Sequence, residues 1–408
     1  MAFGFYIILA AQFLSALADS ALLFVTMDLF AHIHAPDWYI QIAESAFAAA
    51  YVVLAPFVGA FADSLPKGRV MFLSNNLKII GCVAMLFGLD PLVAYAIVGI
   101  GAATYSPAKY GILTEYLPPE KLVTANSWME GLTVAALILG NVLGAVLTSP
   151  HALGRLVAHV HVPLLNTLPG LALAILAVVY VGAAIFALYI PRVAVDHKPL
   201  RKNPLFLIKE FSHCFRLLWK DPLGQVSLSV TTMFWGIGRT MRLLVPAWAV
   251  LALGYSTSQS AYLVALVAVG IAIGAVLAAR FVKLEHAVKV LPVGILMGVL
   301  ILVLIPMKSV WAAGLIVVLT GVVGGYFVVP MNALLQHRGH LLMGAGSSIS
   351  VQNFNENLSI FVMMLLYAAM DWMHLHIFVI VAVFGIMLSG AMGLLARVHG
   401  HDQDMGQA

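Results

Sequence analysis

A carboxylate, Asp19, lies in the middle of an apolar stretch that runs from residue 2 to residue 31. A helix of this length crosses a hydrocarbon core of about 30 Å at about 1.5 Å per residue, which places Asp19 near the middle of a bilayer. A carboxylate there costs about 2.5 to 3.5 kcal/mol on insertion scales, so it faces protein or water and usually has a partner. Gln12 and Ser15 share its helical face, as does Thr26. The helix therefore carries a polar stripe that needs matching surfaces elsewhere.

Four other apolar stretches carry polar stripes at helical spacing. Their members are Thr232, Trp235, Arg239 and Arg242 in the stretch 224–252; Gln352, Asn353, Glu356 and Asn357 in 345–371; Asn126, Glu130, Thr133 and Asn141 in 122–147; and Tyr105 and Lys109 in 92–113. With Asp19, the three acidic and three basic members sum to zero charge. Six unpaired charges would cost about 15 to 20 kcal/mol in a bilayer, so we expect them to pair across one shared cavity.

These stripes predict a substrate site. Asp19, Arg242 and Glu356 lie near the midplane of separate helices and are the expected binding groups for a substrate or a coupling ion. The supporting binding residues are Lys109, Arg239, Gln352, Asn353, Gln12, Ser15 and Tyr105. Phosphate prefers guanidinium groups and ammonium prefers carboxylates, so a cavity with both signs suits a zwitterion better than a sugar. For Lys109 and Glu130 two interpretations stay open, a pair that locks two helices or a cytoplasmic gate.

The composition places these stripes in a polytopic membrane protein. Of the 408 residues, 62% are hydrophobic and only 9% are charged, and the mean hydropathy is +1.01. Apolar runs of about 20 residues indicate helices rather than a barrel. The first run is too long for a signal-peptide core and has no basic leader, so we expect it to be retained. Two cysteines, Cys82 and Cys214, cannot form a disulfide framework.

Twelve spans are expected. They are centred at 5–30, 41–62, 70–88, 92–113, 122–147, 165–190, 224–252, 258–281, 287–306, 311–335, 345–371 and 374–396. With the amino terminus inside, fifteen Lys and Arg residues fall on the cytoplasmic side and only Arg155 and Lys308 on the other. We therefore expect both termini in the cytoplasm, a six-helix bundle at 1–190, a cytoplasmic linker at 191–222 and a second bundle at 223–408. The linker has a basic amphipathic pattern, typical of a helix on the leaflet surface that acts as a tether, or also as a docking surface for a partner enzyme.

The two halves show a repeat. Aligning Pro107 with Pro330 places Asp19 opposite Arg242, and repeated halves with a midplane site are typical of transporters. Two pairs of glycines, Gly140 with Gly144 and Gly270 with Gly274, predict close helix packing, or a seam that admits an acyl chain. Outer-side histidines leave metal binding or pH sensing open; they are His32, His34, His151, His159, His161, His374 and His376. His32 and Asp37 also match the spacing of an acyltransferase motif, but an outer loop is far from cytoplasmic acyl donors.

The loop between the second and third spans resembles the motif of the major facilitator superfamily. Gly59, Asp63, Gly68 and Arg69 match, although the spacing from Asp63 to Gly68 is two residues longer, and Arg280 replaces an acid at the counterpart position. Along its length the chain is more specifically similar to the bacterial lysophospholipid transporter family. The segments that carry this likeness are 11–16 with Asp19, 55–59, 63–71, 105–113, 327–336 and 351–357.

The resemblance implies an all-α integral membrane protein with twelve helices in two six-helix bundles. It implies a flippase of the Gram-negative inner membrane, which moves lysophosphatidylethanolamine and lysophosphatidylglycerol from the outer to the inner leaflet by alternating access. The lipids would be reacylated by a cytoplasmic-side acyltransferase coupled to an acyl-carrier-protein synthetase. The family's important charges correspond to Asp19, Lys109, Arg242 and Glu356, and Glu130, Asp63 and Arg69 would serve as gating or structural charges. No cofactor, metal, enzymatic activity or nucleic-acid partner is expected.

Two other classes of function remain. The chain could be a facilitator-type antiporter that exports amphipathic cations, with Asp19 as the proton carrier. It could also be a membrane scaffold that uses the amphipathic linker, but this would leave the polar stripes without purpose. The sequence does not predict the coupling ion, the headgroup preference, the oligomeric state or the stable conformation.

Overall fold

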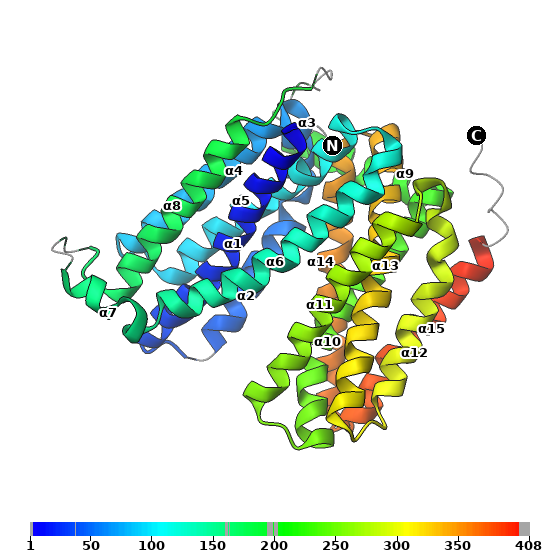
Figure 1. The fold of residues 1–408 in the computed structure, drawn as a ribbon. Coiled ribbons are helices and arrows are strands. Elements are labelled where there is room, and N and C mark those ends of the chain that lie inside the picture. The colour runs from blue at the N-terminus through cyan, green and yellow to red at the C-terminus, as the bar shows by residue number, and fades with distance from the viewer. Residues whose placement is uncertain are drawn as a thin grey trace. The chain divides into compact units, whose positions relative to one another are not determined.

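Helices make up all the regular structure in the part of the chain that the computed structural model describes, residues 3–36, 38–159, 162, 164–193, 199 and 203–399 (Figure 1). The α-helices are α1 (Phe3–His32), α2 (Trp38–Val53), α3 (Ala55–Ser64), α4 (Lys67–Leu86), α5 (Pro91–Tyr116), α6 (Leu122–Leu147), α7 (Pro150–His159), α8 (Leu168–Leu188), α9 (Pro204–Lys220), α10 (Pro222–Leu253), α11 (Thr257–Phe281), α12 (Leu291–Leu304), α13 (Val310–Leu342), α14 (Ala345–Trp372) and α15 (Ile377–His399). The 3₁₀ helices are η1 (Pro119–Lys121) and η2 (Leu284–Val290). The predicted all-helical class is confirmed.

The predicted spans correspond to helices of suitable length. By length and composition, 10 helices in the described residues are able to cross a membrane, and the bent pair α2–α3 raises this to 11. Helix α14 covers the predicted eleventh span but is not among these, because a polar cluster interrupts its apolar sequence. The members of this cluster are Gln352, Asn353, Asn355, Glu356 and Asn357. A total of twelve spans therefore stays a prediction.

The predicted second span, 41–62, is broken rather than continuous. Its two helices meet at Leu54 and are bent by 62° relative to one another. Pro56 lies in the first turn of α3, where its missing N–H costs nothing to α3. The same ring prevents α2 from continuing, because it would clash with the carbonyl of Val52 and remove a hydrogen bond. Pro56 thus favours a break at this point, although α5, α10 and α13 each continue past an interior proline.

The helices form two compact units. Unit 1 contains Met1–Tyr116, Ala135–His213 and Gly344–Val351, and unit 2 contains Leu117–Val134, Cys214–Met343 and Gln352–Ala408. Helices α6 and α14 are thus each divided between the two units. The first part of α14 packs with unit 1, and the first part of α6 packs with unit 2. The predicted domain boundaries at 190 and 223 stay predictions.

Close packing of α4 against α5 and α8 forms the core of unit 1. Leu22, Val98 and Tyr180 are fully buried there. Gly81 and Gly101 lie at the α4–α5 contact, where a Cβ at Gly81 would collide with the Ala94 carbonyl. Small residues let two backbones approach in this way. These contacts hold α4 firmly enough to fix the side chains on its inner face.

Backbone contact between α11 and α13 organises unit 2. A Cβ at Gly270 or Gly274 would collide with the carbonyl of Val318 or Val322, respectively. In unit 1, a Cβ at Gly140 would collide with the Leu17 carbonyl of α1. The packing interpretation of both glycine pairs is therefore confirmed, since each pair contacts a neighbouring helix of its own unit.

We predict that Gly274→Ala destabilises the protein, whereas Gly314→Ala does not. Alanine normally favours a helix by about 1 kcal/mol over glycine, but at position 274 its methyl group would meet the Val322 carbonyl and force α11 and α13 apart. At position 314 the nearest atom, Leu266 Cδ1, is at an ordinary 3.7 Å. Thermal unfolding in detergent should give a loss of about 1 to 3 kcal/mol for the first variant. Equal stability of the two variants would contradict the close contact.

Candidate functional site

An ion pair between Asp19 of α1 and Lys78 of α4 lies at the centre of unit 1. Lys78 Nζ donates to Asp19 Oδ2 at 2.6 Å, and Tyr180 of α8 donates its hydroxyl to Asp19 Oδ1 at 2.8 Å. The side chain of Lys78 is only 1% exposed, whereas that of Asp19 is 24% exposed. The carboxylate therefore holds three helices together and still presents one side to its surroundings.

Further polar and aromatic groups surround the ammonium of Lys78. Its Nζ also donates to Ser15 Oγ at 2.9 Å, and Ser15 Oγ donates to Asn75 Oδ1 at 2.8 Å. The ring centroid of Tyr105 lies 4.9 Å from Nζ, a cation–π distance. The amide nitrogen of Asn75 is buried and has no hydrogen-bond partner among the described residues. A donor is thus available beside the ion pair.

Glycine makes room for this lysine. A Cβ at Gly101 of α5 would lie 2.7 Å from Lys78 Cγ, closer than side chains pack. The absence of a side chain there lets the lysine stem lie along α5 and direct its ammonium toward α1. The sequence pattern did not single out Lys78, although Ser74, Asn75 and Lys78 form a polar face within the predicted third span. That polar face was the sequence feature from which Lys78 could have been identified.

Unit 2 contains a second polar cluster, on α13 and α14. Gln352 Nε2 donates to Glu356 Oε1 at 2.7 Å and to Asn332 Oδ1 of α13 at 2.8 Å. Both Gln352 and Glu356 are nearly buried, at 6% and 9% exposure. The oxygen of the Gln352 amide has no partner among the described residues. The amide therefore orients the glutamate and leaves one acceptor available.

Two arginines of α10, Arg239 and Arg242, are exposed although they lie in a membrane-crossing helix. They are three residues apart, so they point to similar sides of the helix. A guanidinium in the middle of a span faces water or protein rather than lipid, because lipid solvates it poorly. Gly236 allows α10 to approach Ser359 of α14 closely. The same unit thus contains both the arginines and Glu356.

The remaining predicted residues lie in different surroundings. Gln12 and Asn353 are buried, and Glu130, a predicted gating or structural charge, is buried in unit 2. Lys109 is half-buried, and its ammonium lies 4.2 Å from the ring centroid of Tyr110. Unit 1 thus brings together Asp19, Ser15 and Tyr105, and unit 2 brings together Gln352 and Glu356. One cavity shared by all these charges stays a prediction.

A separate ionic cluster fixes the start of α14. Asp63 of α3 accepts from the backbone nitrogens of Gly346 at 2.6 Å and Ser347 at 2.8 Å, where the positive end of the α14 dipole favours a carboxylate. Lys67 pairs with Asp63 at 2.9 Å and with Glu115 of α5 at 3.1 Å. The predicted structural role of Asp63 thus has a geometric basis. The partner in this cluster is Lys67, while Arg69 is exposed.

Two contacts in unit 2 had no counterpart in the sequence predictions. Asn126 of α6 and Gln336 of α13 exchange hydrogen bonds at 2.9 and 2.8 Å. Arg338 Nε donates to Asp221 Oδ2, the N-cap of α10, at 3.2 Å. Partial burial raises the pKa of Asp221, but the Arg338 hydrogen bond and the Gly224 N–H lower it more, so the net pKa lies below the ordinary value. Both contacts join residues more than 100 positions apart, which local spacing does not predict.

The histidine patterns lead to no assembled site. Within the described residues, no group of three His, Cys, Asp or Glu side chains is placed to hold a metal ion. His32 Nδ1 lies 2.8 Å from the Asp28 carbonyl oxygen. The predicted pairing of His159 with His161, and Asp37 of the acyltransferase-like pattern, lie outside the described residues or side chains. The metal and pH-sensing hypotheses stay predictions.

Comparison with known families gives a match over most of the chain. The model of the Major Facilitator Superfamily matches residues 8–364. A lysophospholipid transporter from Serratia proteamaculans is 44% identical over 362 residues, which are 88% of this chain and 87% of that protein. One from Yersinia pestis is 43% identical over 88% of this chain and 85% of its own.

Solved structures share the fold at low sequence identity. A bacterial homologue of the iron transporter ferroportin, in an outward-facing state, superposes with a TM-score of 0.72 at 17% identity over 97% of this chain and 100% of its own. The transporter FucP gives a TM-score of 0.71 at 15% identity over 97% and 98% of the two chains. At these identities the likeness concerns the fold alone.

We predict that Lys78→Met and Asp19→Asn each destabilise the protein more than the two changes combined. Each single variant leaves one charge without its partner in an apolar bundle, which typically costs about 3 to 5 kcal/mol. The double variant removes both charges and keeps the shape of the site. Thermal unfolding of the three variants in detergent measures the coupling. If the stability lost by the double variant equals the sum of the losses of the two single variants, the two charges do not stabilise one another and the prediction is wrong.

Proposed function

Because this chain belongs to the major facilitator superfamily and, within it, to the lysophospholipid transporter family, we propose that it carries lysophospholipids across the bacterial inner membrane. The observation that carries the proposal is the 44% identity over 88% of the chain to a protein of that name. Two polar clusters at helix centres support it, since a transporter needs charged groups within the bilayer. The proposed direction is from the outer to the inner leaflet.

The proposed topology has twelve spans in two six-helix bundles, residues 1–190 and 223–408. The bent pair α2–α3 would be the second span, and α14 the eleventh, with its polar cluster facing the transport path rather than lipid. Basic residues favour cytoplasmic termini. Helix α9 would lie in the cytoplasmic linker, where its exposed Leu205 and Ile208 suit the surface of the leaflet.

Phosphate is the group common to the proposed substrates, lysophosphatidylethanolamine and lysophosphatidylglycerol. Arg242, with Arg239 beside it, offers guanidinium forks that match phosphate geometry. Glu356, held by Gln352 at 2.7 Å, would orient an arginine or accept the ammonium of an ethanolamine headgroup. Lys109, Asn353 and Gln12 would add donors along the path. The single acyl chain would lie against apolar helix surfaces.

The Asp19–Lys78 pair argues against the alternative, an antiporter for amphipathic cations with Asp19 as its carrier. Both Asp19 oxygens already accept hydrogen bonds, from Lys78 at 2.6 Å and from Tyr180 at 2.8 Å. A cationic substrate would have to displace a buried ammonium. A phosphate-bearing substrate that is bound by the arginines of unit 2 would leave this pair in place.

A cytoplasmic acyltransferase coupled to an acyl-carrier-protein synthetase would consume the transported lipid. A lysophospholipid has one free hydroxyl on glycerol, and its reacylation at the inner leaflet would prevent return. Helix α9 is the proposed docking element. Its Phe215 packs on Phe354 of α14, with ring centroids 6.1 Å apart, which would link a partner on α9 to a helix of the polar cluster.

We predict that Arg242→Ala strongly slows translocation of a fluorescent lysophosphatidylethanolamine in proteoliposomes. The loss of the guanidinium should reduce the initial rate by at least tenfold, because a charge-assisted hydrogen bond to phosphate contributes about 1.5 to 3 kcal/mol. Arg239→Ala should have a smaller effect in the same direction. The matched control is Arg280→Ala, an exposed arginine at the end of α11, which should transport at the wild-type rate.

The same vesicles distinguish the alternative function. A pH-sensitive dye in the lumen should respond to added amphipathic cations if the protein is an antiporter. Unchanged lysolipid translocation by Arg242→Ala, with correct insertion of the protein, would exclude the proposed role of that arginine. Proton movement on cation addition without any lysolipid translocation by the wild type would exclude the proposed function itself.

A further inference from the structure

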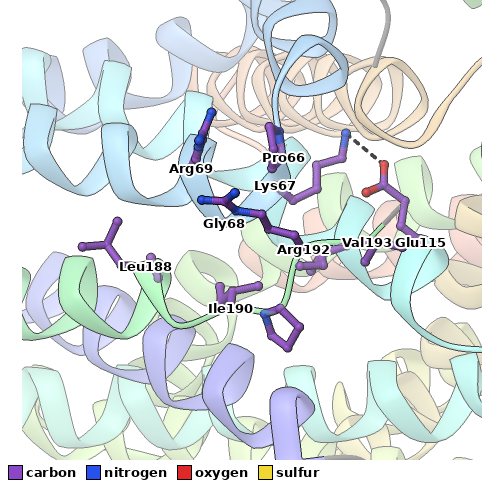
Figure 2. Close-up of a pocket in the computed structure, with 12 residues that line it drawn as sticks. Pro66, Lys67, Gly68, Arg69, Glu115, Leu188, Ile190, Arg192 and Val193 are labelled. Atoms are coloured by element: carbon purple, nitrogen blue, oxygen red, sulfur yellow. Dashed lines mark ion pairs between the residues drawn. The ribbon is translucent and has the colours of Figure 1, made fainter. Parts of the chain in front are cut away.

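A second basic site lies at the start of α4. A cavity of about 70 Å³ is lined by residues 66–69, by Ile112 and Glu115 of α5, by the last two residues of α8, 187–188, and by residues 190–193 (Figure 2). All of these belong to unit 1. Lys67 precedes Lys78 by 11 positions, or about 16 Å along the helix axis. The cavity is therefore distinct from the Asp19–Lys78 site.

The single carboxylate in the lining, Glu115, is already engaged in an ion pair. Glu115 pairs with the buried Lys67 at 3.1 Å, and Lys67 pairs also with Asp63 at 2.9 Å. Figure 2 shows the ion pair of Lys67 and Glu115 on the right, Arg69 on the left and Arg192 in the centre. The negative charge of Glu115 is thus directed toward Lys67.

Arg69 and Arg192 differ from Lys67 in their ion pairing. Arg69 and Arg192 are exposed, and within the described part of the chain no ion pair joins either guanidinium to a carboxylate. Helix α4 also begins here without a side-chain N-cap, so that the positive end of its dipole adds to the field. Two guanidinium groups at the N-terminus of a helix form a suitable setting for a phosphate.

The size of the cavity and the apolar surface beside it indicate the source of that phosphate. The volume of about 70 Å³ is several times the ~10–15 Å³ that one water requires, so it suits a phosphate group but not a whole lipid. Next to it, Leu188 and Tyr189 are 57% and 69% exposed, and Leu73 of α4 is 45% exposed. Exposed apolar side chains on membrane helices contact acyl chains, and tyrosine favours the interface with the headgroups.

We propose that this cavity binds the headgroup phosphate of a bilayer phospholipid between Arg69 and Arg192, with its acyl chains along the exposed sides of α4 and α8. An anionic lipid, such as phosphatidylglycerol, fits the unpaired positive charge best. This lipid is a bound component of the membrane rather than the transported substrate. The proposal goes beyond the proposed function, and lipid binding is measured without transport.

The test compares phosphatidylglycerol binding to the purified full-length protein and its variants by native mass spectrometry from mixed micelles. Arg69→Gln combined with Arg192→Gln should weaken binding at least tenfold relative to wild type. Arg280→Gln is the control, since it removes one exposed arginine far from the cavity in sequence, and it should bind as the wild type does. Phosphatidylethanolamine should bind more weakly than phosphatidylglycerol to the wild type.

Folding of the variants and the source of the phosphate are controlled separately. Circular dichroism establishes whether each variant is folded. If the double variant is not folded, Arg69→Lys serves as the test in its place. This variant keeps the charge but loses the guanidinium fork, and it should give a smaller loss of phosphatidylglycerol binding. Equal phosphatidylglycerol binding by the double variant and the wild type would overturn the proposal. Displacement of the lipid by an equal concentration of inorganic phosphate would overturn the lipid assignment, because a soluble anion would then suffice.

Discussion

The burial of Lys78 is the constraint on which unit 1 depends. An ammonium that is 1% exposed in an apolar bundle needs a counter-charge and several hydrogen-bond acceptors, since its desolvation costs several kcal/mol. Asp19 supplies the charge and Ser15 an acceptor, while Gly101 gives the stem its space. Helices α1, α4, α5 and α8 are therefore held in one register by a single side chain. The same pair leaves the carboxylate partly accessible from one side.

The two units differ in how they present charge. Unit 1 pairs a buried ammonium with a partly exposed carboxylate, whereas in unit 2 Arg239 and Arg242 are exposed residues and Glu356 is held by an amide. An incoming anion can reach a guanidinium on an exposed residue. A buried pair has to be disturbed before it binds anything, so its contribution is to structure first. The proposed assignment of phosphate recognition to the arginines of unit 2 agrees with this difference.

Local patterns predicted the helices and the polar stripes, because the period of the apolar residues and a charge within an apolar stretch can both be recognised in a single segment of sequence. Asp19 was found in this way, and so were Glu356 and Gln352. The partner of Asp19 was missed, since Lys78 lies 59 positions away and a helical pattern does not tell which faces meet. Similarly, the motif pointed to Arg69, but Lys67 makes the ion pairs. Pro56, read as a helix breaker, would have predicted the bend at Leu54.

The amide pair of Asn126 and Gln336 has a consequence of its own. Each side chain donates one hydrogen bond to the other, at 2.9 and 2.8 Å, and neither one titrates or carries a net charge. The contact between α6 and α13 is therefore indifferent to acidity and to ionic strength. The Asp63–Lys67–Glu115 cluster, by contrast, requires ionised carboxylates. The start of α14 thus depends on charge, whereas the contact of Asn126 with Gln336 does not.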